Sequence, residues 1–155
     1  MRYLLSFTLL FFITACSFKG YEQVESKIII IKSPALRFAD LGYIRSSDDS
    51  IELELFIAGK SIKKIAINYL VCVDEGCMSR SSFNKEYLNA AYPDALLQNI
   101  LLGRVIYDGE GQVQEADGFT QRIKNDNVDI KYRVTHKEIF FKDRKNHILF
   151  KIKDI

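Results

Sequence analysis

The chain has 155 residues, with 22 Lys or Arg against 20 Asp or Glu, and its formal net charge is +2. This near-neutral balance argues against nucleic-acid binding, because affinity for phosphate comes from clustered positive charge. Eleven Phe, eight Tyr, many Ile and no Trp favour a β-rich core in a chain long enough for one ordinary domain.

The first residues have the pattern of a secretory signal peptide, in which Arg2 precedes an apolar run over residues 4–15. An uncleaved anchor is the alternative, but a spanning helix needs ~20 apolar residues. The run ends in Ile13-Thr14-Ala15-Cys16, which resembles the lipobox of bacterial lipoproteins. That resemblance implies cleavage before Cys16, a diacylglyceryl group on its thiol and acylation of the new amine.

The residue after Cys16 bears on sorting. In the best-known lipoprotein rules an Asp there retains the protein at the inner membrane, whereas this chain has Ser17. The resemblance therefore implies the outer membrane, on its periplasmic face or at the cell surface. Residues 16–26 are polar and short, and we interpret them as a lipidated tether to a single globular domain over residues 27–155.

Two strands and a turn are predicted next. Four consecutive isoleucines within residues 27–32 indicate a strand buried on both faces, which Pro34 ends or bends. A second strand is expected over residues 35–44. The Ser/Asp cluster at 46–50 is typical of a turn.

Period-two alternation continues the sheet. Residues 51–55 alternate Ile or Leu with Glu, as in a half-buried strand, and residues 58–60 turn the chain. The following strand, at residues 65–73, is predicted to carry five apolar side chains on one face: Ile65, Ile67, Tyr69, Val71 and Val73. A bulge is expected at Lys63-Lys64, which interrupts the alternation.

The middle of the chain is predicted to be helical. Ser82 is expected as an N-cap, Pro93 as the first residue of a leucine-rich helix, and Gly103 as the residue after its end. Residues 107–118 contain three glycines and four acids and are predicted to form a loop.

The last third reads as a β-meander, with strands expected over residues 119–124, 128–135, 138–143 and 147–154. The predicted fold is therefore mainly β or α+β. We expect a curved antiparallel sheet, with an unclosed barrel as one form of it, and one or two short helices inserted before the C-terminal meander.

Cys72 and Cys77 flank the turn at residues 74–76. In an oxidising compartment this spacing allows a disulfide across a hairpin. Free thiols, a redox pair and a metal site are the alternatives, but redox motifs usually have two intervening residues and zinc needs more ligands than lie nearby.

The sequence predicts no enzyme, cofactor or metal site. His136 and His147 are expected as solvated turn residues, with no neighbouring spacing that makes either one a base or a ligand. No serine lies in a Gly-x-Ser-x-Gly elbow, and the glycines at 109 and 111 lie in an acidic loop that would repel phosphate.

The aromatic content has two interpretations. An ordinary core between sheet and helices accounts for it. The alternative is a hydrophobic cleft between a curled sheet and the helix at residues 93–102, sized for acyl chains. The aromatic residues concerned are Phe38, Tyr43, Phe56, Phe83, Tyr87, Phe119, Tyr132, Phe140, Phe141 and Phe150.

Two family resemblances follow from these motifs. Residues 16–21, residues 38–42 and the Cys72/Cys77 pair resemble those of small lipoproteins of Helicobacter- and Campylobacter-type bacteria, which indicates a family but no activity. Leu53-Glu54-Leu55-Phe56, the turn Ile57-Ala58-Gly59, the helix at residues 94–102 and the meander resemble the outer-membrane receptor of the lipoprotein-localisation system.

The receptor resemblance implies an unclosed antiparallel barrel, capped by helices, with an acyl-binding interior. It also implies that Ile57 is an exposed apolar residue that helps insert acyl chains into the membrane. The turn at residues 58–60 places Ile57 near a loop tip, and the alternative is that its side chain packs back onto Phe56 or a neighbouring strand. The tryptophans usual in that family are absent, and its Pro-Leu-Gly-like turn is only loosely kept.

Two functions are expected from the sequence. The first is a membrane-anchored, non-enzymatic domain that binds an apolar ligand or a lipoprotein acyl chain, with a lipoprotein carrier as a further partner, or that has lost this role and kept the fold. The second is a structural or surface-interaction lipoprotein that contacts other envelope proteins.

Overall fold

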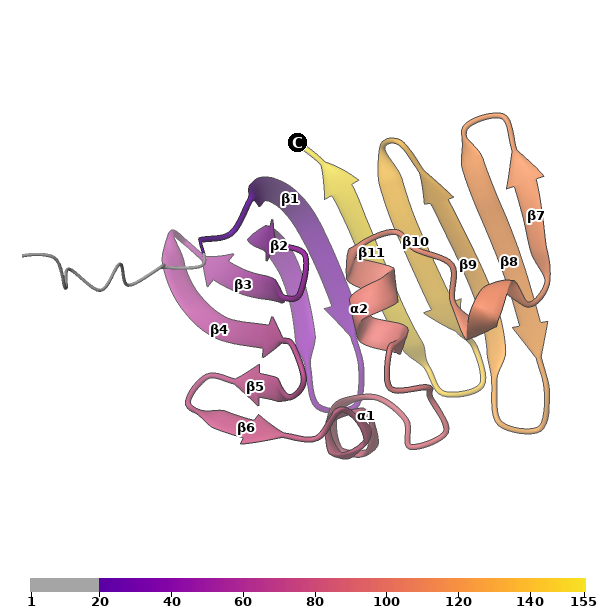
Figure 1. The fold of residues 1–155 in the computed structure, drawn as a ribbon, viewed down its shortest axis with the longest axis horizontal. Helices are drawn as coiled ribbons and strands as arrows, with labels where there is room; N and C mark the ends of the chain where they lie inside the picture. The colour runs from indigo at the N-terminus through magenta and orange to yellow at the C-terminus, as the bar shows by residue number, and fades with distance from the viewer. Residues whose placement is uncertain (1–19) are drawn as a thin grey trace, which may run out of the picture.

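The computed structural model describes residues 20–155, which form one antiparallel sheet of eleven strands (Figure 1). The strands lie in the order β6-β5-β4-β3-β2-β1-β11-β10-β9-β8-β7, so β1 joins the N-terminal strands to the C-terminal meander. Their bounds are β1 Gln23–Lys32, β2 Arg37–Ser46, β3 Ile51–Ile57, β4 Lys60–Ile67, β5 Val71–Val73, β6 Gly76–Met78, β7 Gln112–Glu115, β8 Gly118–Lys124, β9 Asp129–Thr135, β10 Glu138–Asp143 and β11 Ile148–Asp154.

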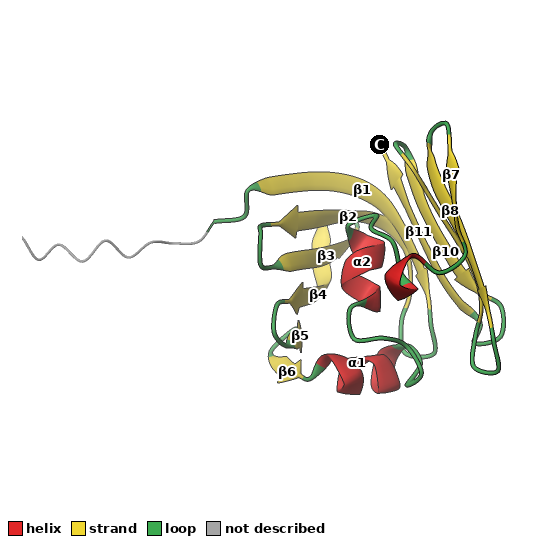
Figure 2. Ribbon diagram, turned by 45° about the vertical axis from the view of Figure 1, so that its right-hand side comes forward, coloured by secondary structure: helices red, strands yellow, loops and turns green. Residues whose placement is uncertain are grey.

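The sheet curves around two short helices, α1 (Arg80–Tyr87) and α2 (Leu96–Leu101), as Figure 2 shows. It remains unclosed, because β6 and β7 are its two edges. We call the side that carries the helices the inner face and the opposite side the outer face. The predicted fold class, a curved antiparallel sheet with two short helices before a C-terminal β-meander, is confirmed.

The first strand begins earlier than the patterning predicts. β1 starts at Gln23, which pairs with Ser46 of β2, so the last four residues of the expected tether belong to the sheet. Backbone pairing along the long β1–β2 hairpin includes these polar residues although they bury little surface. β2 is displaced by two residues from its expected bounds because the hairpin turn runs from Ser33 to Leu36, whose backbones hydrogen-bond.

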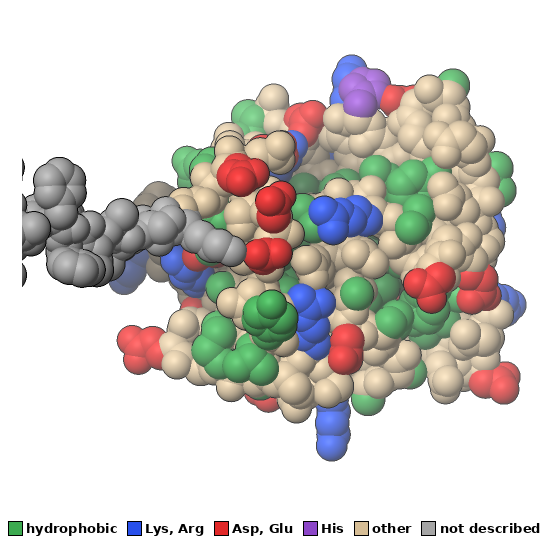
Figure 3. Space-filling model, viewed as in Figure 1, with side chains coloured by type: hydrophobic (Ala, Val, Ile, Leu, Met, Phe, Trp, Pro, Cys, Tyr) green, Lys and Arg blue, Asp and Glu red, His purple; other side chains and the backbone are tan. Residues whose placement is uncertain are grey.

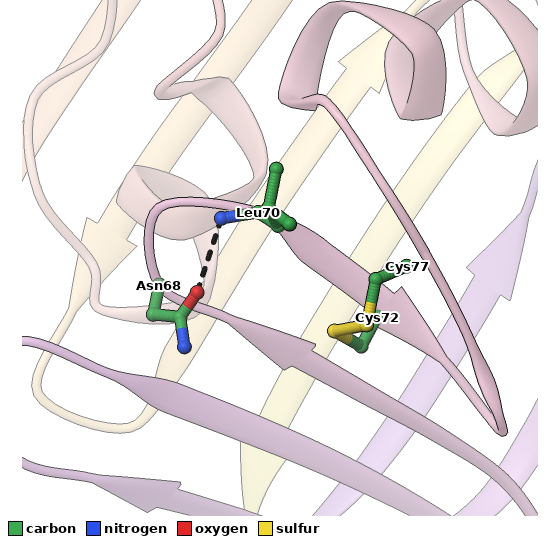
Figure 4. Close-up of a disulfide and its surroundings, with 4 residues drawn as sticks. All are labelled: Asn68, Leu70, Cys72 and Cys77. Atoms are coloured by element: carbon green, nitrogen blue, oxygen red, sulfur yellow. Dashed lines mark hydrogen bonds between the residues drawn. A yellow bond between two sulfur atoms is a disulfide. The ribbon is translucent and has the colours of Figure 1, made fainter.

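The prediction of a single strand over residues 65–73 is wrong, because the chain turns after Ile67. The side-chain oxygen of Asn68 accepts a hydrogen bond from the backbone N–H of Leu70 (3.0 Å; Figure 4). This local bond favours a turn over continued pairing. Tyr69 is consequently 94% exposed rather than part of the inner face. The expected bulge lies one residue earlier, where the β3–β4 register shifts and skips Ile62.

The helices begin at other residues than expected. The N-cap of α1 is Ser79, whose side chain accepts from the backbone N–H of Ser82. α2 begins at Leu96, three residues after Pro93, whose carbonyl accepts the Leu96 N–H in a preceding turn. Gly103 does follow the helix end: its φ is +62°, and the N–H of Arg104 reaches back to the Asn99 carbonyl.

The meander strands lie within one residue of their expected bounds, but β7 was missed. Its four residues are all exposed, so burial gives no periodic pattern, and the strand exists through backbone pairing with β8. Part of the expected loop is thus a strand at the edge of the sheet.

Candidate functional site

The space between α2 and the sheet is filled by core side chains. Four residues of α2 are at most 4% exposed: Leu96, Leu97, Ile100 and Leu101. The cavity enclosed by the two helices and the inner face measures about 10 Å³, no more than one water molecule needs. Of the two interpretations of the aromatic content, the interior therefore fits the ordinary core. An open acyl-sized cleft is not present between α2 and the sheet.

A larger cavity of about 230 Å³ opens at the end of the sheet where β1 begins and β11 ends. We call this cavity the mouth. Its apolar walls are Ile44, Leu101, Leu102, Val134, Ile139 and Ile152. Its polar rim includes Gln23, Glu25, Lys27, His136, Lys137 and Asp154. The mouth thus joins a charged rim to an apolar floor that is continuous with the core.

The rim follows from unequal strand lengths. β11 pairs with β1 only from Lys27 onward, where Lys27 faces Asp154. Residues 23–26 pair with β2 alone, so among the described residues their other edge faces the mouth. The inner face of β1 changes along its length from Glu25 and Lys27 to Ile29 and Ile31, which marks the boundary between rim and core.

Lys27 organises the charges of this rim. Its Nζ lies 2.7 Å from Glu25 Oε2 and 2.6 Å from Asp154 Oδ1. Burial alone would lower the pKa of Lys27, but hydrogen bonds to Asp154 and Glu25 raise it overall, and the same ammonium lowers the pKa of Asp154. Lys27 therefore stays charged and gives the rim a fixed cation between two carboxylates.

The end of α2 forms the floor of the mouth. At Gly103, a Cβ would meet Val134 Cγ1 at 3.2 Å, and the φ of +62° also disfavours a side chain. This glycine lets the helix end pack closely on β9 and β10. Leu101 and Leu102 are thereby held against the sheet beneath the rim.

Ile57 lies at the tip of the β3–β4 hairpin. Ala58 and Gly59 both have positive φ and form the tight turn, and Ile57 is 51% exposed just before it. Ile62, the residue skipped by the register, is 42% exposed on the same hairpin. The hairpin also carries the exposed Lys60, so its tip combines apolar and basic side chains.

Cys72 and Cys77 face each other across the β5–β6 hairpin at disulfide distance (Figure 4). The pair links the three-residue edge strand β6 to β5, its one neighbour among the described strands. Cys16 lies outside the described residues, so the structure does not bear on its lipidation.

Apart from His136, the remaining polar groups lie away from the mouth. His136 lies on the rim and contacts Asp117, whereas the exposed His147 lies at the far end of β11 with a φ of +57°. Buried Asp143 accepts hydrogen bonds from Tyr92 Oη and Asn146 Nδ2 and fixes the β10–β11 turn. Within residues 20–155, no group of three or more His, Cys, Asp or Glu could hold a metal ion.

Sequence patterning located part of this site and missed the rest. It placed Ile57 near a loop tip and brought residues 93–102 against the sheet. It missed Lys27 and Asp154, which lie at opposite ends of the chain. The available signal was the alternation Glu25, Lys27, Ile29, Ile31, in which one face of a strand changes from charged to apolar.

None of the helices in the described part of the chain is long and apolar enough to span a bilayer. No family model, curated protein or solved structure matches the chain.

Proposed function

We propose that the protein is a membrane-anchored lipoprotein, held by lipid on Cys16, whose non-enzymatic domain binds one apolar ligand or acyl chain at the mouth. The observation that carries this proposal is the amphipathic mouth, in which an apolar floor lies beneath a charged rim. An amphipathic ligand fits such a site because its chain loses contact with water on the floor while its polar end stays at the rim.

The architecture supports the same proposal. A curved, unclosed antiparallel sheet with helices on its inner face is the arrangement that the receptor resemblance implied. A cavity of about 230 Å³ accepts only part of a long acyl chain. A longer chain must displace α2, which is six residues long and packs through apolar side chains.

Ile57 has the exposure that its proposed membrane or acyl contact requires. Its side chain is half exposed at a tight hairpin tip, where it contributes little to the core. In this proposal the β3–β4 hairpin touches the membrane or the acyl chain that is being transferred.

Anchoring is tested at Cys16. Each buried methylene stabilises attachment by ~0.8 kcal/mol, so two or three fatty chains hold a protein firmly. Cys16→Ala should abolish incorporation of a metabolic fatty-acid probe and leave the chain unprocessed. Full labelling of this variant would rule out attachment through Cys16.

Ligand binding is tested at Leu102, which is half-buried on the floor of the mouth. Native mass spectrometry of the full-length protein should detect a lipid adduct beyond the covalent acyl chains. Leu102→Gln should remove that adduct, because the floor becomes polar. Val105→Gln is the matched control, since Val105 is 37% exposed and does not line the mouth.

The second candidate is a structural or surface-interaction lipoprotein that contacts other envelope proteins. The filled interior favours it, because the enclosed cavity of about 10 Å³ holds no acyl chain in this conformation. The same mass spectra decide: absence of any adduct from the unmodified protein favours this second function.

A further inference from the structure

Five cations lie in one line across the outer face of the sheet. Arg122 of β8 pairs with Lys131 of β9, which pairs with Lys142 of β10. Lys142 faces Leu149 of β11, and Leu149 faces Lys32 of β1. Lys32 in turn pairs with Arg37 of β2. We call this line the cation row: Arg122, Lys131, Lys142, Lys32 and Arg37.

All five side chains point away from the core. Each has a buried chain neighbour on the inner face, such as Ile31 beside Lys32 and Phe141 beside Lys142. Four of the five residues are exposed, and Lys131 is half-buried. Six strands at ~4.8 Å spacing make a row about 24 Å long.

The row is unfavourable for folding. Like charges directly opposite each other in a sheet are destabilising. Among the described residues, none of the five cations makes an ion pair, whereas Arg45 and Lys64 on the outer face are paired with Glu52 or Glu54. An acid at one of these positions would relieve the repulsion with its cross-strand neighbours, so cross-strand pairing does not explain the row.

Two open depressions flank the centre of the row. One measures about 420 Å³ and includes Lys32 and Arg37, and the other measures about 360 Å³ and includes Lys142 and Arg144. Both share Lys32 and His147. They also include buried inner-face residues, Phe38 in one and Asp143 in the other, so they open at the strand ends beside the row, where an anionic group can approach Lys32 together with Arg37 or Lys142.

The outer face also carries apolar side chains, and the segment that precedes β1 contacts it. On β1, Val24 and Ile28 are 58% and 41% exposed on the same face as Lys32. Tyr21, just before β1, donates a hydrogen bond to Glu52, which points outward from β3. The inner side seen in Figure 3 instead shows acidic and basic side chains interspersed. Tyr21 therefore contacts the outer face of the sheet, at the end of β1 opposite to Lys32.

We propose that the cation row docks the outer face onto the anionic lipid headgroups of the membrane. The choice of membrane rests on the attachment in the proposed function. It is also favoured by the aliphatic Val24 and Ile28, since basic and aliphatic side chains together suit a headgroup layer. The row itself contains no aromatic side chain, whereas a single-strand nucleic-acid surface combines basic residues with aromatic stacking platforms.

The absence of Trp from the chain allows a direct test. Leu149→Trp, at the centre of the row, is introduced into the full-length lipidated protein and reconstituted in vesicles containing brominated lipid. Its fluorescence should be strongly quenched in vesicles of phosphatidylglycerol and phosphatidylcholine, and weakly in phosphatidylcholine alone. Ile30→Trp, half-buried on the same face, serves if the first variant fails to fold.

Introducing Lys32→Gln and Lys142→Gln into the Leu149→Trp protein should lower the equilibrium constant for docking about 30-fold, since each charge near an anionic surface contributes roughly five-fold. Lys85→Gln with Arg104→Gln removes two cations from the helix side and should leave quenching unchanged. Equal quenching in both vesicle types, or no effect of removing the row, overturns the proposal. So does a response to an oligonucleotide without a response to anionic vesicles. Protein released from the vesicles altogether contradicts the attachment through Cys16 instead.

Discussion

Ile57 is the residue at which the proposed membrane contact can be tested separately from fold stability. Because its side chain is half exposed before a tight turn, Ile57→Glu should change the free energy of unfolding by less than ~0.5 kcal/mol. The same variant should weaken transfer of an acyl chain or lipoprotein to vesicles. Val113→Glu, at an exposed position on β7, controls for an added charge. A large drop in Tm with unchanged transfer would identify Ile57 as a core residue.

Asp143 makes stability depend on pH. Burial alone would raise the pKa of this carboxyl, but hydrogen bonds from Asn146, Tyr92 and the Asp129 backbone lower it overall. A folded pKa below the unfolded value stabilises the protein above about pH 4, and that stability is lost as the pH falls through the folded pKa. Asp143→Asn should lower the free energy of unfolding by about 2 kcal/mol at neutral pH. In urea unfolding measured at several pH values, the variant should also lose less stability than the unmodified protein as the pH falls below about 4. If the variant loses as much stability at acid pH as the unmodified protein, other carboxylates cause the pH dependence.

At the scale of elements, the β5–β6 hairpin depends on its cysteines. β6 has three residues and one neighbouring strand, so few backbone bonds hold it in place. The six-residue loop closed by Cys72 and Cys77 should contribute ~2 kcal/mol through the unfolded chain. Cys72→Ser with Cys77→Ser should lower unfolding free energy by about that amount and speed amide exchange in β6. Two thiols alkylated without reductant in the exported protein would exclude the bridge.

Elements with period-two burial could be predicted, and elements held by pairing alone could not. β9 and β11 alternate buried with half-buried or exposed residues, and β3 alternates Ile or Leu with Glu although Glu52 is also buried; the expected bounds of these strands were close. β7 and the first four residues of β1 are exposed throughout, so only their neighbours define them as strands. At residues 68–70 the apolar pattern continued while the Asn68 side chain turned the chain.

For the whole molecule, a net charge of +2 conceals a strong segregation of charge. The cation row brings together residues from positions 32 to 142, which become neighbours only through the register of six strands. Composition therefore pointed away from polyanions although one face is basic. The mouth is hidden in sequence for the same reason, since its rim joins residues near the two ends of the domain.

The pairing of β1 with β11 also sets the order in which the protein can fold. Lys27 of β1 and Asp154 of β11 form a side-chain hydrogen bond between these two strands and are 127 residues apart in the sequence. Closing so long a loop is slow, because chain entropy is lost before the contacts form. In a chain that enters an export channel from its N-terminus, the centre of the sheet stays incomplete until the last strand has emerged. For the proposed exported lipoprotein, pairing of β1 with β11 would therefore complete the sheet only after translocation, and the unpaired edge of β1 would need protection from aggregation meanwhile.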